Sequence, residues 1–177
     1  GRLGLLAILF EFIDEGRTVW TVGTGRNRYQ FVYAPDLAKA CIQALSYEGS
    51  RIFNVGSDNV PDLRTVYEHV IEHAGTESKV RSLPKTATLL AMKIAHWLHL
   101  SPLGPYQYKM IAEDFQFDTT RIKHELGWHP TLNNSEMLLR AYSYYHENRT
   151  DILQRHNTSS HRKPAHMGII RLVKWLS

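Results

Sequence analysis

The sequence predicts an α/β fold made of helices and a few short strands. Two units in which a strand leads to a helix favour this class. Residues 18–22 are followed by a helix over residues 37–45, and residues 51–55 by a helix over residues 63–74. The chain has 177 residues, 43% of them hydrophobic, which is enough to bury one core with a small additional subdomain.

The first helix is expected over residues 3–15, and Gly16 suits the left-handed C-cap that would end it. Apolar residues recur on one face of this segment at helical spacing, which predicts that most of the helix is buried. These residues are Leu5, Leu6, Leu9, Phe10 and Ile13.

A glycine turn follows the first strand. Gly23 and Gly25 allow positive backbone φ angles that other residues avoid. Two cations and an amide come next on the turn, from Arg26, Asn27 and Arg28. Together with the apolar run of residues 31–33, this pattern predicts a small hairpin with a polar, cationic tip.

Asp36 is expected to serve the next helix as its N-cap or first-turn carboxylate, because it follows Pro35 and precedes an apolar helical pattern. Cys41, the one cysteine, lies on the apolar face of that helix, so we expect a buried core residue. A chain with one cysteine makes no internal disulfide, and we expect a reducing cytoplasm as its location.

Later segments carry similar local signals. Residues 51–55 read as a buried strand of a parallel sheet, and residues 80–83 as another short strand. Asp62 and Gly75 delimit the helix over residues 63–74, and further helices are expected over residues 86–98, 119–126 and 137–148. Asp118 caps the segment 119–126, Gly127 ends it, and Trp128 is expected to serve packing.

Charge and hydropathy exclude several classes of protein. No apolar run reaches the roughly 20 residues of a membrane-spanning helix. The net charge is +4, yet residues 1–151 hold 16 cations and 17 acids, which leaves the excess to five cations beyond residue 154. The basic character belongs to this tail, so we expect no nucleic-acid binding by the body.

One motif suggests a metal. His69, Glu72 and His73 match the inverted zinc-protease pattern His-x-x-Glu-His, in which two imidazoles share a zinc ion and the glutamate acts as base. The same residues also suit the solvated shoulder of a helix. Zinc hydrolysis is therefore kept as a remote alternative.

Three motifs in order carry a family resemblance. The first is Gly-x-Gly-x-Asn-Arg-Tyr-Gln-Phe-Val-x-x-x-Asp-Leu-Ala over residues 23–38, followed by Phe-Asn-Val-Gly at 53–56 and by Asp-x-x-x-x-Lys-x-Glu-Leu-Gly-Trp-x-Pro at 118–130. Over residues 1–149 the chain resembles the C-terminal half of extended short-chain dehydrogenases, the NAD-dependent epimerase/dehydratase family acting on nucleotide sugars. The resemblance implies the substrate-binding part of a Rossmann-type enzyme.

The family's other signatures do not occur in this sequence. No Gly-x-x-Gly-x-x-Gly follows a strand, and Tyr106 precedes Lys109 by three residues where a Tyr-x-x-x-Lys motif needs four. We therefore expect the N-terminal dinucleotide-binding half to be absent, with NAD or NADP bound mainly by that half. The resemblance leaves no catalytic, cofactor-binding or metal residue in this segment, and we leave open whether the chain is an enzyme.

The resemblance assigns substrate-binding roles to six residues: Trp20, Val22, Asn27, Arg28, Phe31 and Lys109. Trp20 and Val22 would lie on the strand beside the nucleotide base, with Phe31 near it. Lys109 would contact the diphosphate. Arg2 is a weaker phosphate or ribose candidate. Tyr29 departs from the pattern, since many nucleotide-sugar enzymes carry arginine there, which leaves room for another alcohol or ketone substrate.

Three segments are expected: the substrate-binding portion at 1–149, a polar linker at 150–164, and a basic amphipathic helix at 165–177. That last helix would dock on the protein or touch an anionic membrane weakly. The expected ligand is a nucleotide sugar or a similar small molecule, and a homodimer is left open. The alternative function is a non-catalytic, truncated or membrane-peripheral interaction module with the same fold.

Overall fold

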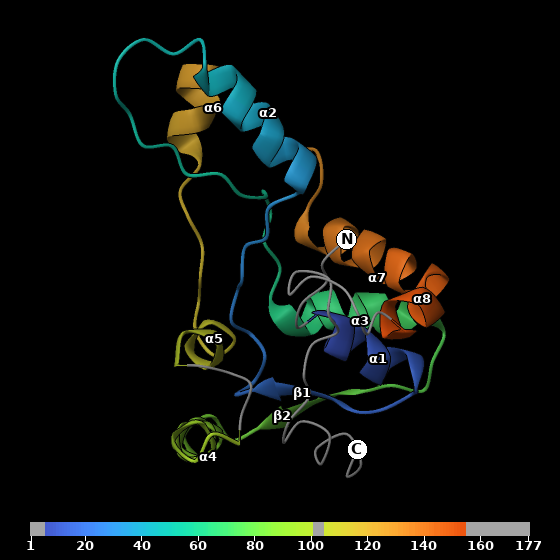
Figure 1. Ribbon diagram of the computed structural model, residues 1–177. Helices are drawn as coiled ribbons and strands as arrows, with labels where there is room; N and C mark the ends of the chain where they lie inside the picture. Colours follow the sequence, from blue (N-terminus) through green and yellow to red (C-terminus); the bar gives the residue numbers. More distant parts are fainter. Residues whose placement is uncertain (1–5, 101–104, 155–177) are drawn as a thin grey trace.

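The computed structural model describes residues 6–100 and 105–154 (Figure 1). Within them the helices are α1 (Leu6–Asp14), α2 (Ala34–Ala44), α3 (Leu63–Ala74), α4 (Lys85–Trp97), α5 (Pro105–Met110), α6 (Thr120–Leu126), α7 (Asn134–Glu147) and α8 (Arg149–Gln154). The strands are β1 (Val19–Val22) and β2 (Val80–Leu83). The α/β class with few short strands agrees with the sequence prediction.

The two strands pair in parallel, with Val19 opposite Val80 and Val22 opposite Leu83. A parallel pair needs a crossover connection, and α2 and α3 lie between the strands in the chain. The glycine turn after β1 therefore does not make the predicted hairpin, and this prediction is wrong. Residues 31–33 instead run past the N-terminus of α7.

The main core lies among α1, α3 and α7, with β1 along its edge (Figure 1). Phe10 and Ile13 of α1 are fully buried, as the apolar face predicted, and Val66 and Val70 of α3 meet them. The Phe10 ring lies 5.7 Å from that of Tyr145, in the range where aromatic pairs add stability beyond burial. This core holds the turn after β1 in place.

A second, smaller cluster joins α2 to α6 and consists of Ala40, Ile122 and Trp128. Trp128 is fully buried, as predicted, and its indole Nε1 donates to the Asp36 carbonyl at 2.8 Å. Asp36 is not the N-cap of α2, which is Tyr33, but it lies in the first turn of the helix, which was the other role predicted for it. Its buried carboxylate instead accepts hydrogen bonds from the backbone N–H and hydroxyl of Thr131 at 2.8 Å each, because the chain returns there after α6.

Helix termini follow their sequence signals closely. The Asp62 carboxylate accepts from the Thr65 N–H at 2.8 Å, and Gly75 ends α3 with φ +64°. Asn133 and Glu136 form a reciprocal capping box that begins α7 three residues before the predicted start. These signals need only neighbouring residues to operate.

Two predictions about buried apolar residues are wrong. Cys41 is exposed, because the apolar face of α2 has no covering element among the described residues. Residues 51–57 form no strand, and Ile52 is 82% exposed. A strand of a parallel sheet needs a neighbour to pair with, and the described part of the chain supplies none here.

The predicted segment boundaries meet the structure only in part. Helix α8 runs to Gln154, and Ile152 is buried in the main core, so the predicted linker begins inside a helix. Arg2 and residues 155–177, including the predicted C-terminal helix, lie outside the described residues. None of the described helices combines the length and hydropathy needed to cross a bilayer.

Candidate functional site

The glycine turn closes tightly on its own strand. Gly23 and Gly25 have φ angles of +72° and +75°, and a Cβ atom on Gly25 would lie 3.0 Å from the Thr21 side chain. The Thr21 hydroxyl donates to the Arg81 carbonyl across the strand pair at 3.2 Å. This close approach leaves no room for a side chain at position 25, so the turn requires glycine there.

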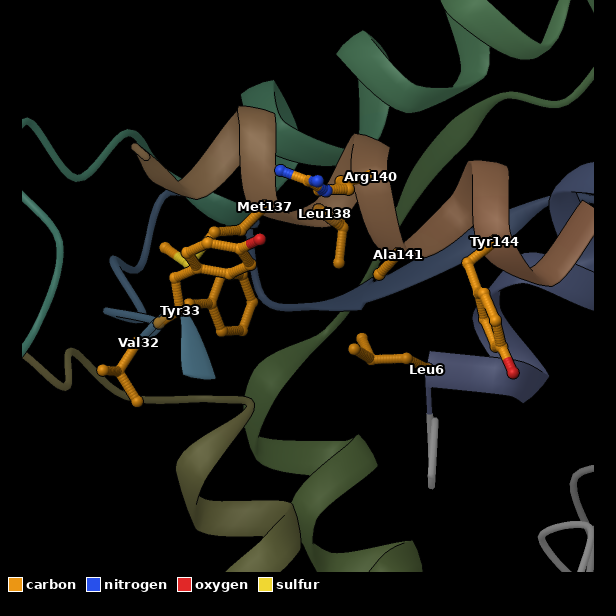
Figure 2. A pocket seen from close by; sticks show the side chains of 9 residues that line it. Leu6, Val32, Tyr33, Met137, Leu138, Arg140, Ala141 and Tyr144 are labelled. Carbon is orange, nitrogen blue, oxygen red and sulfur yellow. The ribbon is translucent and has the colours of Figure 1, made fainter. Parts of the chain in front are cut away.

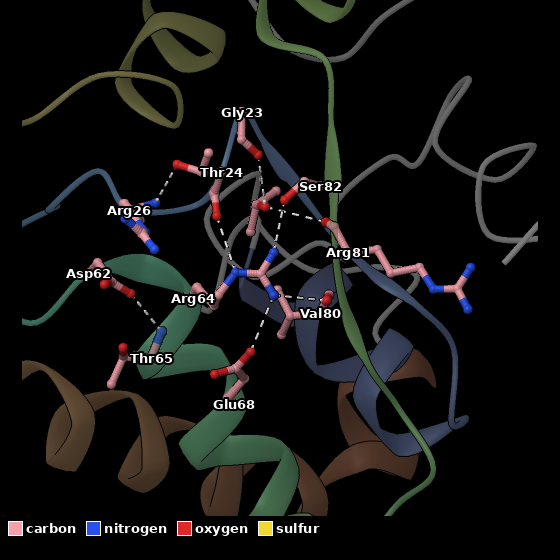
Figure 3. Close-up of polar contacts among 11 residues, drawn as sticks. Gly23, Thr24, Arg26, Asp62, Arg64, Thr65, Glu68, Val80, Arg81 and Ser82 are labelled. Atoms are coloured by element: carbon pink, nitrogen blue, oxygen red, sulfur yellow. Dashed lines mark hydrogen bonds and ion pairs between the residues drawn. The ribbon is translucent and has the colours of Figure 1, made fainter.

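Arg64 of α3 fixes the turn to β2 (Figure 3). Its guanidinium donates to the Thr24 carbonyl at 3.1 Å, to the Val80 carbonyl at 3.0 Å and to the Ser82 hydroxyl at 2.8 Å. It also pairs with Glu68 at 3.2 Å. The planar fork of donors suits this multiple contact. No local pattern in the sequence marks Arg64, the second residue of α3, as an anchor of the turn.

Asn27 ties the turn to the segment after α5. Its amide nitrogen donates to the carbonyls of Ile111 and Glu113, both at 3.2 Å. Both amide hydrogens are thus used to position the backbone, and within residues 6–100 and 105–154 no hydrogen bond to the amide oxygen is found. Asn27 therefore brings the turn next to the segment that follows Lys109.

Arg28 continues this attachment through its backbone. Its N–H donates to the Asp114 carboxylate at 2.7 Å, and its carbonyl accepts from the Phe115 N–H at 2.7 Å. The Arg28 side chain is exposed, as is that of Lys109 on α5. Two of the predicted cations thus present their side chains to solvent from neighbouring segments.

An aromatic group lies beside these cations. The Tyr29 and Phe115 rings stack with centroids 5.6 Å apart and planes at 21°, and Tyr29 lies 5.3 Å from Phe31. Burial, reinforced by the nearby Tyr106 hydroxyl, raises the pKa of Tyr29 above its ordinary value. Burial also raises the pKa of Tyr67 to about 12. Both phenols are therefore protonated at neutral pH and suit hydrogen bonding or stacking better than proton abstraction.

Asn134, at the start of α7, holds the backbone that carries the aromatic group. Its buried amide donates to the Tyr29 carbonyl at 2.6 Å and accepts from the Phe31 N–H at 3.0 Å. It also accepts from the Ser57 hydroxyl at 2.6 Å. One side chain thus satisfies backbone groups that a strand partner would otherwise serve. No local pattern in the sequence marks Asn134 for this role.

A hollow of about 340 Å³ opens on the other side of Phe31, between α1 and α7 (Figure 2). Its walls are mainly apolar, and Arg140 lies at the rim with its guanidinium carbon 5.5 Å from the centroid of the Tyr33 ring. Such a concave apolar surface with one cation is suited to a planar or apolar group. The main wall residues are Leu6, Phe31, Tyr33, Met137, Ala141 and Tyr144.

The six predicted binding residues thus fall in three places. Trp20 and Val22 lie on β1, where Val22 is 7% exposed and Trp20 is half-buried. Asn27 and Arg28 lie on the turn beside the segment that follows Lys109. Phe31 belongs to both the aromatic group and the hollow. That these residues bind one ligand together stays a prediction.

The described residues offer no metal centre. Among residues 6–100 and 105–154, no group of three histidine, cysteine, aspartate or glutamate side chains is placed to hold a metal ion. His69, Glu72 and His73 are all exposed on α3. The zinc alternative is therefore not carried forward.

Comparison with known families now adds to this geometry. The model of the family described as NAD dependent epimerase/dehydratase matches residues 3–56, which contain α1, β1, the glycine turn and α2. Over residues 3–56 the chain is therefore similar to the NAD dependent epimerase/dehydratase family. The resemblance drawn from the three motifs is confirmed.

One curated relative and several solved structures align with most of the chain. The uncharacterized protein y4nG of Sinorhizobium fredii (strain NBRC 101917 / NGR234) is 37% identical over 175 residues, which are 99% of this chain and 44% of the relative. UDP-glucose 4-epimerase of Thermotoga maritima, solved with UDP-glucose, aligns at TM-score 0.59 and 20% identity. That alignment covers 82% of this chain and 40% of the enzyme.

Two further structures show the same fold. An epimerase of Methanothermobacter thermautotrophicus aligns at TM-score 0.61 and 11% identity, over 83% of this chain and 38% of its own. The dTDP-glucose 4,6-dehydratase of Bacillus anthracis, solved with NAD, aligns at TM-score 0.57 and 15% identity. That alignment covers 82% of this chain and 40% of the dehydratase. The chain thus spans less than half the length of these relatives, and at such identities the likeness shows the fold alone.

Proposed function

We propose that this chain supplies the substrate-binding portion of an NAD(P)-dependent oxidoreductase of the epimerase/dehydratase type. The observation that carries the proposal is the family match over residues 3–56, which contain the glycine turn bearing Asn27 and Arg28. The bound molecule is a nucleotide sugar or a similar small molecule, by analogy with the relatives solved with UDP-glucose or with UDP and NAD.

The described residues do not form a dinucleotide site of their own. The next helix after β1 begins at Ala34, so no helix starts directly after the glycine turn to direct backbone N–H groups at a pyrophosphate. NAD or NADP would supply the hydride chemistry from a site made by another portion. We therefore expect this chain by itself to bind substrate and to catalyse no reaction.

The surface of α2 and residues 51–57 suits contact with such a portion. Ile42 and Leu45 are 66% and 85% exposed, and Ile52 beyond them is 82% exposed. Residues 51–55 pair with no strand among the described residues, whereas the Ser57 N–H donates to the Phe31 carbonyl at 2.9 Å. A segment without a strand partner can pair with a strand of another portion. We infer that a dinucleotide-binding portion packs here.

Saturation-transfer NMR with UDP and UDP-glucose tests the binding role. We expect signal transfer to the uracil ring, and a loss of at least about threefold in affinity for Lys109→Ala or Arg28→Ala, since each removes one cation near the diphosphate. Arg26→Ala is the matched control, because Arg26 is an exposed cation on the same turn that is not predicted to bind. Equal losses from all three substitutions, or no transfer to the wild-type chain, would contradict the proposal.

A further inference from the structure

Four aromatic side chains lie on one side of two paired extended segments. The segment with Tyr29 bridges in parallel to the segment with Phe115. Side chains two residues apart in an extended chain point the same way, so Phe31 accompanies Tyr29. Phe117 accompanies Phe115 in the same way, and the centroids of their rings are 4.8 Å apart. We call these four rings the aromatic face, of which Phe117 is 44% exposed and the other three are half-buried.

Three phenols meet at the aromatic face. Tyr67 reaches it from α3 and Tyr106 from α5. Burial is the main cause that raises the pKa of Tyr29 and of Tyr67, and the Tyr106 phenol adds to the first rise and the Tyr29 phenol to the second. Such an influence requires the groups to be close. Within residues 6–100 and 105–154, no hydrogen bond of these three hydroxyls is found. The described residues thus leave three neighbouring hydroxyls available to a ligand.

Neutral hydroxyls beside aromatic rings suit a sugar. A phenol both donates and accepts hydrogen bonds, as a sugar hydroxyl does, whereas it carries no charge to attract a phosphate group. The aromatic rings offer an apolar surface to the C–H groups of the sugar. Tyr67 is withdrawn from water by burial, so a hydrogen bond from a ligand would offset part of the cost of burying its hydroxyl. An uncharged ring that carries hydroxyls therefore fits this place better than a phosphate.

Lys109 relates this place to the rest of the substrate. It follows Tyr106 by three residues on α5, and residues three apart on a helix are neighbours, with Cβ atoms about 5–6 Å apart. Lys109 is the cation for which contact with the diphosphate is expected. A sugar joined to a diphosphate at Lys109 therefore lies within reach of the aromatic face.

We propose that Tyr29, Tyr67 and Tyr106 bind the sugar ring of the substrate, with its hydroxyls on the phenols and its C–H groups on the aromatic face. The assignment rests on the proposed function, in which this chain binds a nucleotide sugar. Tyr29 and Tyr67 then determine specificity for the sugar, and other residues, among them Lys109, bind the nucleotide.

Saturation-transfer titrations of the full chain with UDP and with UDP-glucose test the assignment. Tyr29→Phe and Tyr67→Phe each remove one hydroxyl and no packing carbon, so the variants should fold, which circular dichroism checks. We expect each variant to bind UDP-glucose about three- to tenfold more weakly, the effect of one hydrogen bond, while its affinity for UDP changes by less than about twofold.

The matched control is Tyr33→Phe, which loses a hydroxyl from the same extended segment but at the hollow beside Arg140 (Figure 2). We expect this variant to bind both ligands like the wild type. The assignment is overturned if Tyr29→Phe and Tyr67→Phe weaken UDP and UDP-glucose equally, or if both bind UDP-glucose as tightly as Tyr33→Phe does. In those cases the wild-type chain still binds UDP and the proposed function stands. A wild-type chain that binds neither ligand contradicts the proposed function, and the assignment with it.

Discussion

Replacing Asn134 with alanine should be among the most destabilising single substitutions in this chain. The amide has no solvent exposure and makes three hydrogen bonds of 2.6–3.0 Å, to Tyr29, Phe31 and Ser57. A buried polar group left without a partner costs about 1–3 kcal/mol. Alanine leaves two backbone groups and one hydroxyl unsatisfied, while its better helix propensity returns at most about 0.7 kcal/mol. We expect a net loss of about 3 kcal/mol.

The neighbouring Asn133 supplies the control. Its side chain caps α7 through the Glu136 N–H at 3.0 Å, and removal of such a cap costs about 0.5–2 kcal/mol. Urea unfolding followed by far-UV circular dichroism should therefore give a clearly lower midpoint for Asn134→Ala than for Asn133→Ala. An m-value of about 1–3 kcal/mol/M converts the expected loss to a shift of at least about 1 M. If Asn133→Ala is the more damaging of the two, the role assigned to Asn134 is wrong.

Three further predictions address the turn, its anchor and the phenols. Gly25→Ala should lower stability by about 1 kcal/mol more than Gly75→Ala in thermal unfolding. Both glycines have positive φ, but a Cβ atom crowds Thr21 only at Gly25, so equal losses would contradict the close approach. Arg64→Lys should cost about 1–2 kcal/mol by the same measurement because an ammonium lacks the planar fork that reaches two carbonyls and the Ser82 hydroxyl at once. An unchanged stability of Arg64→Lys in thermal unfolding would show that the guanidinium geometry is unimportant. The raised pKa of Tyr67 means that its contribution to stability is complete below pH 10 and is lost as pH rises towards about 12. Tyr67→Phe should reduce the fall of the urea midpoint between pH 10 and about pH 12. If the urea midpoint of this variant falls with pH as steeply as that of the wild type, Tyr67 does not have the raised pKa.

The sequence predicted those elements whose signals are local. Asp62 and Gly75 mark α3 through contacts within a few residues of each end, and the apolar face of α1 is buried as expected. Trp128 was likewise expected to serve packing. Such features depend on neighbours along the chain, so a single sequence contains the information needed to find them.

The features that were missed depend on residues far apart in the chain. The backbone of Phe31 bonds to Asn134, which is 103 residues away, and this pairing replaces the predicted hairpin. Cys41 and Ile52 were expected to be buried because apolar periodicity shows which face could be covered but not whether a partner is present. For the site, the sequence identified the glycine turn, while Arg64 and Asn134 have no local signature.

The small cluster around Trp128 sets how the molecule should respond to heat. Within the described part of the chain, the cluster that joins α2 to α6 has three buried apolar residues, fewer than the main core. Side chains such as Asp36 and Asn54 connect it to neighbouring segments. Amide protons there should exchange with deuterium well before those of α1, α3 and α7. The small cluster should therefore unfold at a lower temperature than the main core. A protein that covers Ile42 and Leu45 would stabilise it and merge these two thermal transitions into one, which calorimetry would detect.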